Sequence, residues 1–335
     1  MQVVRVDART LTALVVCSAF AACDGDVLAF DCVKASNLFE KAICADAGAR
    51  AADEAMSRAF SDLLARTDAK SRAESTKAQV AWISQRNNGC ADRKGTALSG
   101  CLASASERRR AFLAGQAEQG PGPSSPIGPW FRFEKGGKGK AEVDMELLVF
   151  SDPKTSGERA FNAAARKLLD DIVEPEKGDP DSDRYAFATN MRLIFASPKL
   201  VSAQAQGYAD SGGAHPNSYI SNINLDVQAG KLASFDDVFD SKSADKVFAA
   251  CMEQIKSARQ ERMGPDGPLT ADDLKQLAKN VKSSTSDLGA WSFEDRQAIV
   301  TYNPYSVGSY AEGYYDCKIG YDQLRPLVKP SFPLP

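Results

Sequence analysis

The sequence contains one histidine among 335 residues. This scarcity excludes zinc sites built on histidine pairs and phosphorelay histidine pairs. The motifs G-x-S-x-G, C-x-x-C and H-x-E are absent as well, so no nucleophile elbow and no usual zinc-ligand spacing is indicated. The net charge of −3 lacks the excess of basic residues that nucleic-acid binding requires. We therefore expect neither a metal nor another cofactor, and no nucleic-acid partner.

The sequence also has little that is long and hydrophobic. The one uncharged apolar run, residues 11–22, is shorter than the roughly 20 residues that a membrane-spanning helix needs. Arg5 and Arg9 precede it, as in a secretory signal. Residues 1–22 are therefore predicted to be a signal peptide, and the protein is predicted to reach the periplasm or the cell envelope.

Two processing sites are possible at the end of this signal. "FAAC", which ends at Cys23, resembles a lipoprotein box, whereas Ala19-Phe20-Ala21 offers an ordinary A-x-A cleavage site. Cys17 lies inside the signal. If Cys23 carries lipid, six of the eight cysteines remain for disulfides, and an even number suits an exported protein. We expect lipidation at Cys23, so that the protein contacts the membrane only through this anchor, with plain cleavage as the alternative.

The rest of the chain falls into three segments. Residues 24–116 are rich in alanine and helical in pattern, residues 117–129 form a Pro/Gly/Ser linker, and residues 130–335 mix strands with helices. With 335 residues, two domains are expected. The fold class predicted is α+β: a small, disulfide-stapled helical domain followed by an α+β domain with a largely antiparallel sheet.

The helical segment is predicted to form a hairpin of two long helices plus one further helix. Asp46 is a good N-cap for the first of these. Apolar residues then recur at the helical spacing of three or four. The residues expected to face inward are Ala52, Met56, either Ala59 or Phe60, Leu63, Thr76, Val80, Trp82, Ile83, Leu102, Ala105 and Phe112.

In the second region, residues 218–228 alternate between apolar and polar side chains. This period of two predicts a half-buried strand, with Asn222, Asn224 and Asp226 on its polar side. Further strands are expected over 141–150 and 184–197, and an amphipathic helix over 158–173.

The single histidine lies in "DSGGAHPNSY", residues 210–219. Two glycines permit positive φ angles, and Pro216 restricts His215 to an extended conformation. Glycine, proline and asparagine together are typical of a turn between strands. A surface loop that contacts a partner is the functional alternative. Another suggestive stretch, "KGGKGK" at residues 135–140, lacks the order of a phosphate-binding loop and is predicted to be a charged hairpin tip.

Residues 28–113 resemble the LprI-type lysozyme-inhibitor family. The resemblance rests on "FDCVKASNLFEKAICAD", "DEAMSRAFSDLL", "QVAWISQRNNGC" and "CLASASERR". These stretches contain the family's cysteines, an acidic residue on the first helix, a Gln-x-x-Trp and an arginine before the third cysteine. The positions are Cys32, Cys44, Cys90, Cys101, Asp53, Gln79, Trp82 and Arg86. The resemblance implies a lysozyme inhibitor.

Residues 130–329 resemble the C-terminal domain of RsiV-type proteins, most clearly from residue 205 onward. The resemblance rests on "SGGAHPNSYISNINLDVQAGKLASFDDVF" and "YNPYSVGSYAEGYYDCKIGYDQLRPLV". This domain occurs in lysozyme-sensing anti-sigma factors and in some envelope polysaccharide deacetylases. The present sequence shows neither a deacetylase metal motif nor a sigma-binding segment. The enzymatic and signalling uses of the domain are therefore not expected here.

The function predicted is that of an exported envelope protein that inhibits lysozyme or a related glycosidase and has no catalysis of its own. His215, Asn217 and Tyr219 are the predicted partner contacts. The alternative is a structural or peptidoglycan-binding module whose exposed tyrosines face sugar rings, although core packing explains those tyrosines as well. The tyrosines concerned are Tyr302, Tyr305, Tyr310, Tyr314 and Tyr315. A peptidoglycan hydrolase is a third, weaker hypothesis.

Three disulfides are predicted. If the two long helices form a regular hairpin, level positions pair Cys44 with Cys90 and Cys32 with Cys101. Cys251 and Cys317 each lie on the apolar side of their element, and an exported protein favours a bond between them. A Cys251–Cys317 disulfide would therefore fix a helix to the C-terminal strand.

Overall fold

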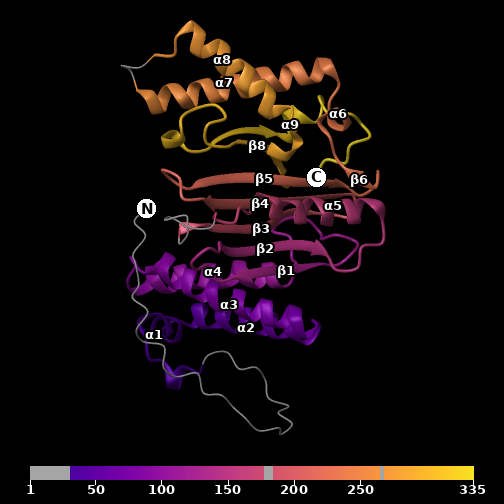
Figure 1. Cartoon of the computed structure of the whole chain (residues 1–335). Helices are drawn as coiled ribbons and strands as arrows, with labels where there is room; N and C mark the ends of the chain where they lie inside the picture. Colours follow the sequence, from indigo (N-terminus) through magenta and orange to yellow (C-terminus); the bar gives the residue numbers. More distant parts are fainter. Residues whose placement is uncertain (1–30, 177–183, 265–267) are drawn as a thin grey trace.

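The computed structural model describes residues 31–176, 184–264 and 268–335. A helical unit, a six-stranded central sheet and a C-terminal layer follow one another through the molecule (Figure 1). In these residues no helix is both long and apolar enough to cross a membrane. The predicted signal peptide and Cys23 lie outside the described residues.

The helical unit contains more helices than the sequence pattern predicted. Asp46 separates the first two helices, because its carboxylate accepts a hydrogen bond from Ala49 N at 2.9 Å and starts a new helix. Asp68 caps the third helix in the same way. The elements are η1 (Cys32–Lys34), α1 (Leu38–Ala45), α2 (Ala47–Ala65), α3 (Ala69–Cys90) and α4 (Gly95–Leu113).

The predicted inward face is confirmed on α2 and mostly wrong on α3, where Trp82 alone of the predicted residues packs against the core. Ala52, Met56 and Leu63 of α2 are buried. On α3, however, Val80 is 62% exposed and Ile83 is 37% exposed. The buried face of α3 carries Ser75, Ala78, Gln79 and Cys90 instead. Hydrogen bonds inside the unit satisfy the polar members of this face, so apolar periodicity selected the wrong side of the helix.

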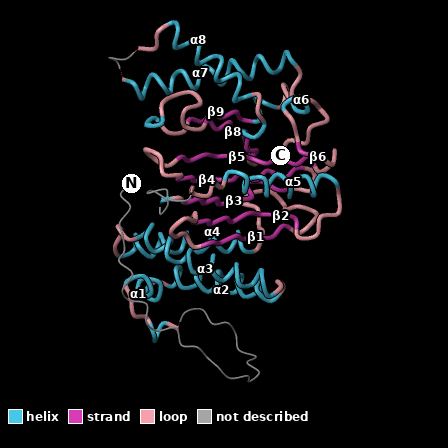
Figure 2. The backbone as a smooth tube through the Cα atoms, viewed as in Figure 1, coloured by secondary structure: helices cyan, strands magenta, loops and turns pink. Residues whose placement is uncertain are grey.

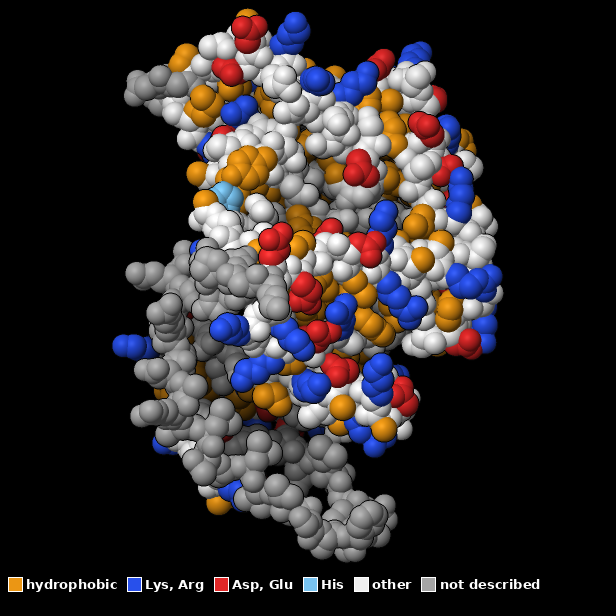
Figure 3. Space-filling model, viewed as in Figure 1, with side chains coloured by type: hydrophobic (Ala, Val, Ile, Leu, Met, Phe, Trp, Pro, Cys, Tyr) orange, Lys and Arg blue, Asp and Glu red, His pale blue; other side chains and the backbone are white. Residues whose placement is uncertain are grey.

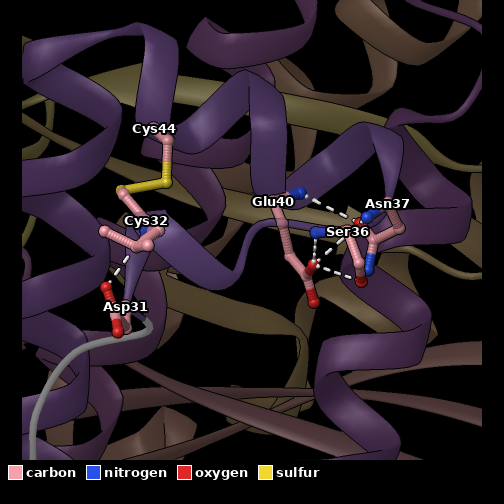
Figure 4. Close-up of a disulfide and its surroundings, with 7 residues drawn as sticks. Asp31, Cys32, Ser36, Asn37, Glu40 and Cys44 are labelled. Atoms are coloured by element: carbon pink, nitrogen blue, oxygen red, sulfur yellow. Dashed lines mark hydrogen bonds between the residues drawn. A yellow bond between two sulfur atoms is a disulfide. The ribbon is translucent and has the colours of Figure 1, made fainter.

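The two disulfides of the helical unit are local, and the predicted pairing is wrong. Cys32 bonds to Cys44, and Cys90 bonds to Cys101. Cys44 belongs to the short helix α1 and not to the long hairpin, so counting level positions along that hairpin does not apply to it. Each bond instead joins the two sides of a turn. Figure 4 shows the first bond, which joins η1 to the last turn of α1, and the start of the same helix, where Glu40 accepts hydrogen bonds from Ser36 and Asn37.

The central sheet has the order β1-β2-β3-β4-β5-β6. All neighbours are antiparallel except β2 and β3, so the predicted largely antiparallel sheet is confirmed. A crossover that contains α5 joins the parallel pair (Figure 2). The elements are β1 (Ile127–Glu134), β2 (Glu142–Phe150), α5 (Ser156–Lys167), η2 (Leu168–Asp171), β3 (Ala186–Ala196), β4 (Leu200–Asp210), β5 (Asn217–Asp226) and β6 (Lys231–Leu232).

Both faces of the sheet are covered at β5. Phe161 of α5 packs with Leu193 and Ile223 in the core on one face. On the other face Asn222 and Asn224, predicted to lie on a polar side, are only 6% and 4% exposed. The side-chain amide of Asn224 donates to Leu288 O and Trp291 O, and that of Asn222 donates to Gly289 O. The prediction of a half-buried strand is therefore wrong, because a second layer supplies acceptors for these amides.

The C-terminal layer packs its own helices over the second sheet, β7-β8-β9. Cys251 of α7 bonds to Cys317 of β9, as predicted. The capping boxes at Ser234 and Thr270 begin two of the helices. The elements are α6 (Phe235–Val238), α7 (Ser241–Met263), α8 (Ala271–Thr285), η4 (Leu288–Ala290), β7 (Trp291–Phe293), β8 (Gln297–Tyr302), η5 (Tyr310–Glu312), β9 (Tyr315–Gly320) and α9 (Tyr321–Leu324).

Residues 117–129, the predicted linker, are fixed along the sheet. Glu118 N donates to Leu193 O at 2.8 Å, and Gly122 N donates to Ala196 O at 2.9 Å. The Arg192 guanidinium binds both carboxylate oxygens of Glu118 at 2.6 Å. Ile127–Pro129 already belong to β1. This segment therefore attaches the helical unit to the sheet, and the division into domains remains a prediction.

Candidate partner-binding site

The predicted contact loop meets a second loop far away in the sequence. His215 Nε2 lies 3.0 Å from the hydroxyl of Tyr305, and the imidazole stacks on the ring of Tyr310 with centroids 4.0 Å apart. Tyr305 and Tyr310 are themselves 5.6 Å apart. Tyr208 of β4, which is 39% exposed, lies near enough to Tyr310 for the two hydroxyl groups to interact electrostatically. We refer to Tyr208, His215, Tyr305 and Tyr310 as the aromatic cluster.

Hydrogen bonds hold the two loops of the aromatic cluster together. The Tyr310 hydroxyl donates to Pro216 O at 2.7 Å. The side-chain amide of Asn303 donates to Ile220 O and accepts from Ile220 N, at 3.0 and 2.7 Å. These bonds connect the end of β8 to β5, so the rings are arranged before any partner binds.

Tyr305 has an unusual backbone conformation. Its φ angle of 70° makes it the one residue other than glycine with positive φ in the described part of the chain. Aromatic residues rarely adopt this region, and such strain persists only where the surrounding structure imposes it. The side chain is 60% exposed, so the strained backbone directs an aromatic ring into solvent. Figure 3 shows the pale-blue histidine beside an exposed hydrophobic patch on this face.

Glu312 fixes the short turn that presents Tyr310. Its carboxylate accepts from Ser309 N at 2.6 Å, from the Tyr315 hydroxyl at 2.5 Å and from Arg259 Nε at 3.2 Å. Burial alone raises the pKa of Glu312, but the hydrogen bonds from these partners outweigh it and lower this pKa to about 2. The turn η5 is therefore held by a carboxylate that is charged at all moderate pH values.

The structure separates the three residues predicted to contact the partner. His215 lies in the aromatic cluster, and Asn217 is exposed at the first position of β5. Tyr219 points to the opposite face, where its ring lies against Gly207. Burial raises the pKa of Tyr219, and its hydroxyl interacts with Thr189 and Asp171. Tyr219 therefore does not share a surface with His215.

The sequence interpretation missed the pairing of His215 with Tyr305 and Tyr310. Both tyrosines were named only for the glycan alternative, as part of an aromatic segment. Other tyrosines of that segment belong to the core, since Tyr302 and Tyr315 are at most 2% exposed. The signal that could have distinguished them is the pattern of Asn303-Pro304, Gly308 and Gly313, which predicts loops around Tyr305 and Tyr310.

The surroundings of His215 do not resemble a catalytic triad. Nδ1 lies 3.0 Å from Pro216 O, and Nε2 faces a tyrosine hydroxyl, so neither nitrogen contacts a serine or a carboxylate. Among residues 31–176, 184–264 and 268–335, no three His, Cys, Asp or Glu side chains gather as a metal site requires. The arrangement suits recognition by stacking and hydrogen bonding.

The motif residues of the helical unit form a buried network. Arg86 Nη1 binds Asp53 Oδ1 at 2.7 Å. Arg109 Nε donates to Gln79 Oε1 at 2.9 Å, while Arg109 Nη1 binds Glu146 Oε2 of β2 at 2.7 Å. Both guanidinium groups lie 5.2 Å from the ring centroid of Trp82. These residues therefore hold the helices together and attach them to the sheet.

A groove on the outer side of the helical unit is the second exposed apolar feature. It has a volume of about 410 Å³ and runs between α1, α2 and α3. Val80 and Ile83, whose exposure contradicts the predicted inward face, lie on its rim. Its floor contains Ile43 and Met56. We refer to this feature as the helical groove.

Family comparisons match both ends of the chain. Residues 32–113 match the model "Lysozyme inhibitor LprI", and residues 236–322 match "Protein of unknown function (DUF3298)". The first match covers the helical unit from η1 to α4, and the second runs from α6 into α9. The two resemblances predicted from the sequence are thereby confirmed in these ranges. The central sheet lies between the two matches.

Two solved structures resemble part of the chain. A DUF3298 family protein from Pseudomonas aeruginosa PAO1 is 19% identical with a TM-score of 0.40, over 62% of this chain and 97% of its own. A member of the same family from Bacteroides fragilis NCTC 9343 is 13% identical with a TM-score of 0.43, over 62% and 94%. No curated protein matches the chain significantly.

Proposed function

We propose that this protein is an exported cell-envelope protein that binds and inhibits lysozyme or a related glycosidase, without catalysis of its own. The observation that carries the proposal is the match of residues 32–113 to the LprI lysozyme-inhibitor family. The local disulfides of this region support the export that the proposal requires, because such bonds persist in oxidising compartments. Retention at the membrane through Cys23 remains part of the proposal.

We assign the contact with the glycosidase to the aromatic cluster and Asn217. Rigid, exposed tyrosines are frequent anchors of protein interfaces, since they bury a large area and lose little conformational entropy. A glycosidase cleft contains a pair of carboxyl groups, which favour hydrogen-bond donors from an inhibitor. Asn217, two residues from His215 and exposed at the start of β5, offers an amide donor. Residues 130–335, which contain the aromatic cluster, also carry most of the acidic residues of the chain. Their negative charge suits a basic lysozyme.

The helical groove is the competing contact surface. It lies within the matched residues and exposes Val80 and Ile83. The motif residues themselves do not favour it as a contact, because Asp53 and Arg86 are buried and paired with each other. The two surfaces are far apart in the chain and can be altered independently.

The test measures the activity of several lysozymes in the presence of the purified mature protein, together with the dissociation constant by calorimetry. Replacing Tyr305 and Tyr310 by alanine should weaken binding by about 30-fold, as expected for the loss of hot-spot residues. A matched control replaces Val80 and Ile83 by serine and should change binding less than threefold. If the control alone weakens binding, the contact lies in the helical groove. Absence of both inhibition and binding at micromolar protein would overturn the proposed function.

A further inference from the structure

A cavity lies at the junction between the helical unit and the central sheet. It has a volume of about 730 Å³ and is bounded by the first half of α3, by β1 and by the hairpin between β1 and β2. This volume lies within the range of ordinary ligand sites. The hairpin is the "KGGKGK" segment, and a bridge between Gly137 and Lys140 confirms the predicted hairpin tip. None of these residues belongs to the aromatic cluster or to the helical groove.

The cavity is rich in positive charge although the whole chain carries −3. Its cationic lining residues are Lys70, Lys77, Arg132, Lys135 and Lys140, and we refer to it as the basic groove. Two carboxylates also line it, and each is already paired with one of these cations. Glu74 binds Lys77 Nζ at 3.0 Å, and Glu134 binds Arg132 Nε at 2.7 Å.

Three of the five cations remain available to a ligand. In the described part of the chain, Lys70, Lys135 and Lys140 form no ion pair within 4 Å, and all three are exposed. Three ammonium groups around one cavity repel each other, so an anionic ligand would relieve that repulsion. The basic groove therefore favours a ligand with negative charges.

The basic groove also contains an aromatic wall. Phe133 of β1 is half-buried, lines the cavity and lies on the face of β1 turned to the helices, whereas Trp130 borders the cavity from the opposite face of the strand and packs against the core under α5. Aromatic rings on the wall of a groove bind the apolar faces of flat rings, whether sugars or bases. The carboxylates of Glu74 and Glu134 accept hydrogen bonds, which suits a ligand with many hydroxyl groups. They disfavour nucleic acid, whose closely spaced phosphates would meet two negative charges.

We propose that the basic groove binds an acidic polysaccharide, with carboxylates of the glycan at Lys70, Lys135 and Lys140 and a sugar ring against Phe133. Peptidoglycan, which carries carboxylates along a polysaccharide chain, has this chemistry. The inference does not rest on the proposed inhibition of lysozyme, since it concerns a different surface and a different ligand. From the sequence, peptidoglycan binding is the alternative function, with exposed tyrosines as its contacts. The basic groove provides a different site for that function.

The experiment measures co-sedimentation of the full mature protein with purified, insoluble peptidoglycan. The substitutions Lys70→Glu, Lys135→Glu and Lys140→Glu, made together, should reduce the bound fraction at least tenfold. A control with the same change in net charge carries Lys242→Glu, Lys246→Glu and Lys275→Glu, three exposed lysines of α7 and α8, and should bind like the wild type. Chitin, a neutral polysaccharide, should retain neither the wild type nor the two triple variants.

Several results would overturn the inference. Equal losses in both triple variants would show a net-charge effect, and equal retention on chitin would show that the carboxylates are not recognised. Tighter binding of duplex DNA or of anionic phospholipid vesicles than of peptidoglycan would replace the glycan as ligand. Lysozyme inhibition by the basic-groove variant should remain at the wild-type level, and circular dichroism should show an unchanged fold. Failure of this inference is thereby distinguishable from failure of the proposed function.

Discussion

One buried pair of oppositely charged side chains attaches the helical unit to the central sheet. Arg109 is 3% exposed and Glu146 is 5% exposed, and they meet at 2.7 Å across the boundary. A buried pair of this kind adds little net stability, but loss of one partner leaves the other charge without compensation. These two residues therefore determine the relative position of the layers more than they determine total stability. The sequence did not reveal the pair, because nothing in "ERRR" marks which arginine is buried.

The substitution Glu146→Gln should destabilise the protein by roughly 3 kcal/mol, because the Arg109 guanidinium keeps its charge in a buried site. Urea unfolding followed by tryptophan fluorescence measures this. The double variant Arg109→Met, Glu146→Met removes both charges and should lose clearly less stability than the single variant. Equal or additive losses would show that the pair has no coupling.

Glu312 predicts a dependence of stability on pH. Its pKa is about 2 in the folded protein, against 4.5 for an ordinary glutamate. Because the folded pKa is the lower one, the stabilisation is complete above pH 4.5 and is lost as the pH falls towards 2. The loss should be roughly 1–3 kcal/mol for a group that is mostly buried. Chemical unfolding at a series of pH values should show a smaller acid loss for Glu312→Gln, and identical curves would contradict the assignment.

At the scale of helices and strands, the sequence predicts most of the types and few of the partners. Capping residues act locally, so the helix start at Asp46 was correctly predicted. The exposed face of α3 and the buried amides of β5 depend on layers from distant parts of the chain, which a local pattern does not contain. The same limit explains the disulfides: the fold class was predictable, whereas the pairing required knowing that α1 is a separate helix.

Removal of one local disulfide should have a modest cost. The bonds Cys32–Cys44 and Cys90–Cys101 close short loops, with separations of 12 and 11 residues. The chain-entropy estimate gives roughly 3 kcal/mol for such a loop. Serine replacement of Cys90 and Cys101 should lower the unfolding free energy by about that amount in denaturant titrations.

The comparison variant replaces Cys251 and Cys317 by serine. This bond closes a separation of 66 residues, so the same estimate gives roughly 4 kcal/mol. The bond also lies in the core of the C-terminal layer, with both cysteines fully buried. A smaller loss for this variant than for the local one would show that unfolded-chain entropy does not govern these bonds.

At the scale of the whole molecule, the helical unit is incomplete without the sheet. Phe131 of β1 packs with Met56, Leu63 and Leu113 in one core, and Glu146 of β2 neutralises Arg109. The match to an inhibitor family thus covers a part of the protein whose core includes residues outside the match. The aromatic cluster likewise exists only where loops from two separate sheets meet, which is why His215 alone gave an ambiguous signal.

A fragment of residues 31–116 should therefore be less stable than the same region in the full chain. Removing the sheet exposes Leu113 and leaves the Arg109 guanidinium without the carboxylate of Glu146. A destabilisation of 1 kcal/mol lowers the thermal midpoint of a small domain by about 4–8 °C. The thermal midpoint of the fragment should therefore be at least 10 °C below that of the full chain. Differential scanning calorimetry of the fragment and of the full protein measures the difference. A fragment that unfolds at the temperature of the full chain would show that the two regions are independent.

The covering of β5 on both faces sets an order for folding during synthesis. The amides of Asn222 and Asn224 find their acceptors only at residues 288–291, which emerge from the ribosome much later. Until then the nascent chain exposes one side of its central sheet, with polar groups that only water can satisfy. The central layer therefore cannot close before residues 288–291 have been synthesised, which would suit the export that we propose.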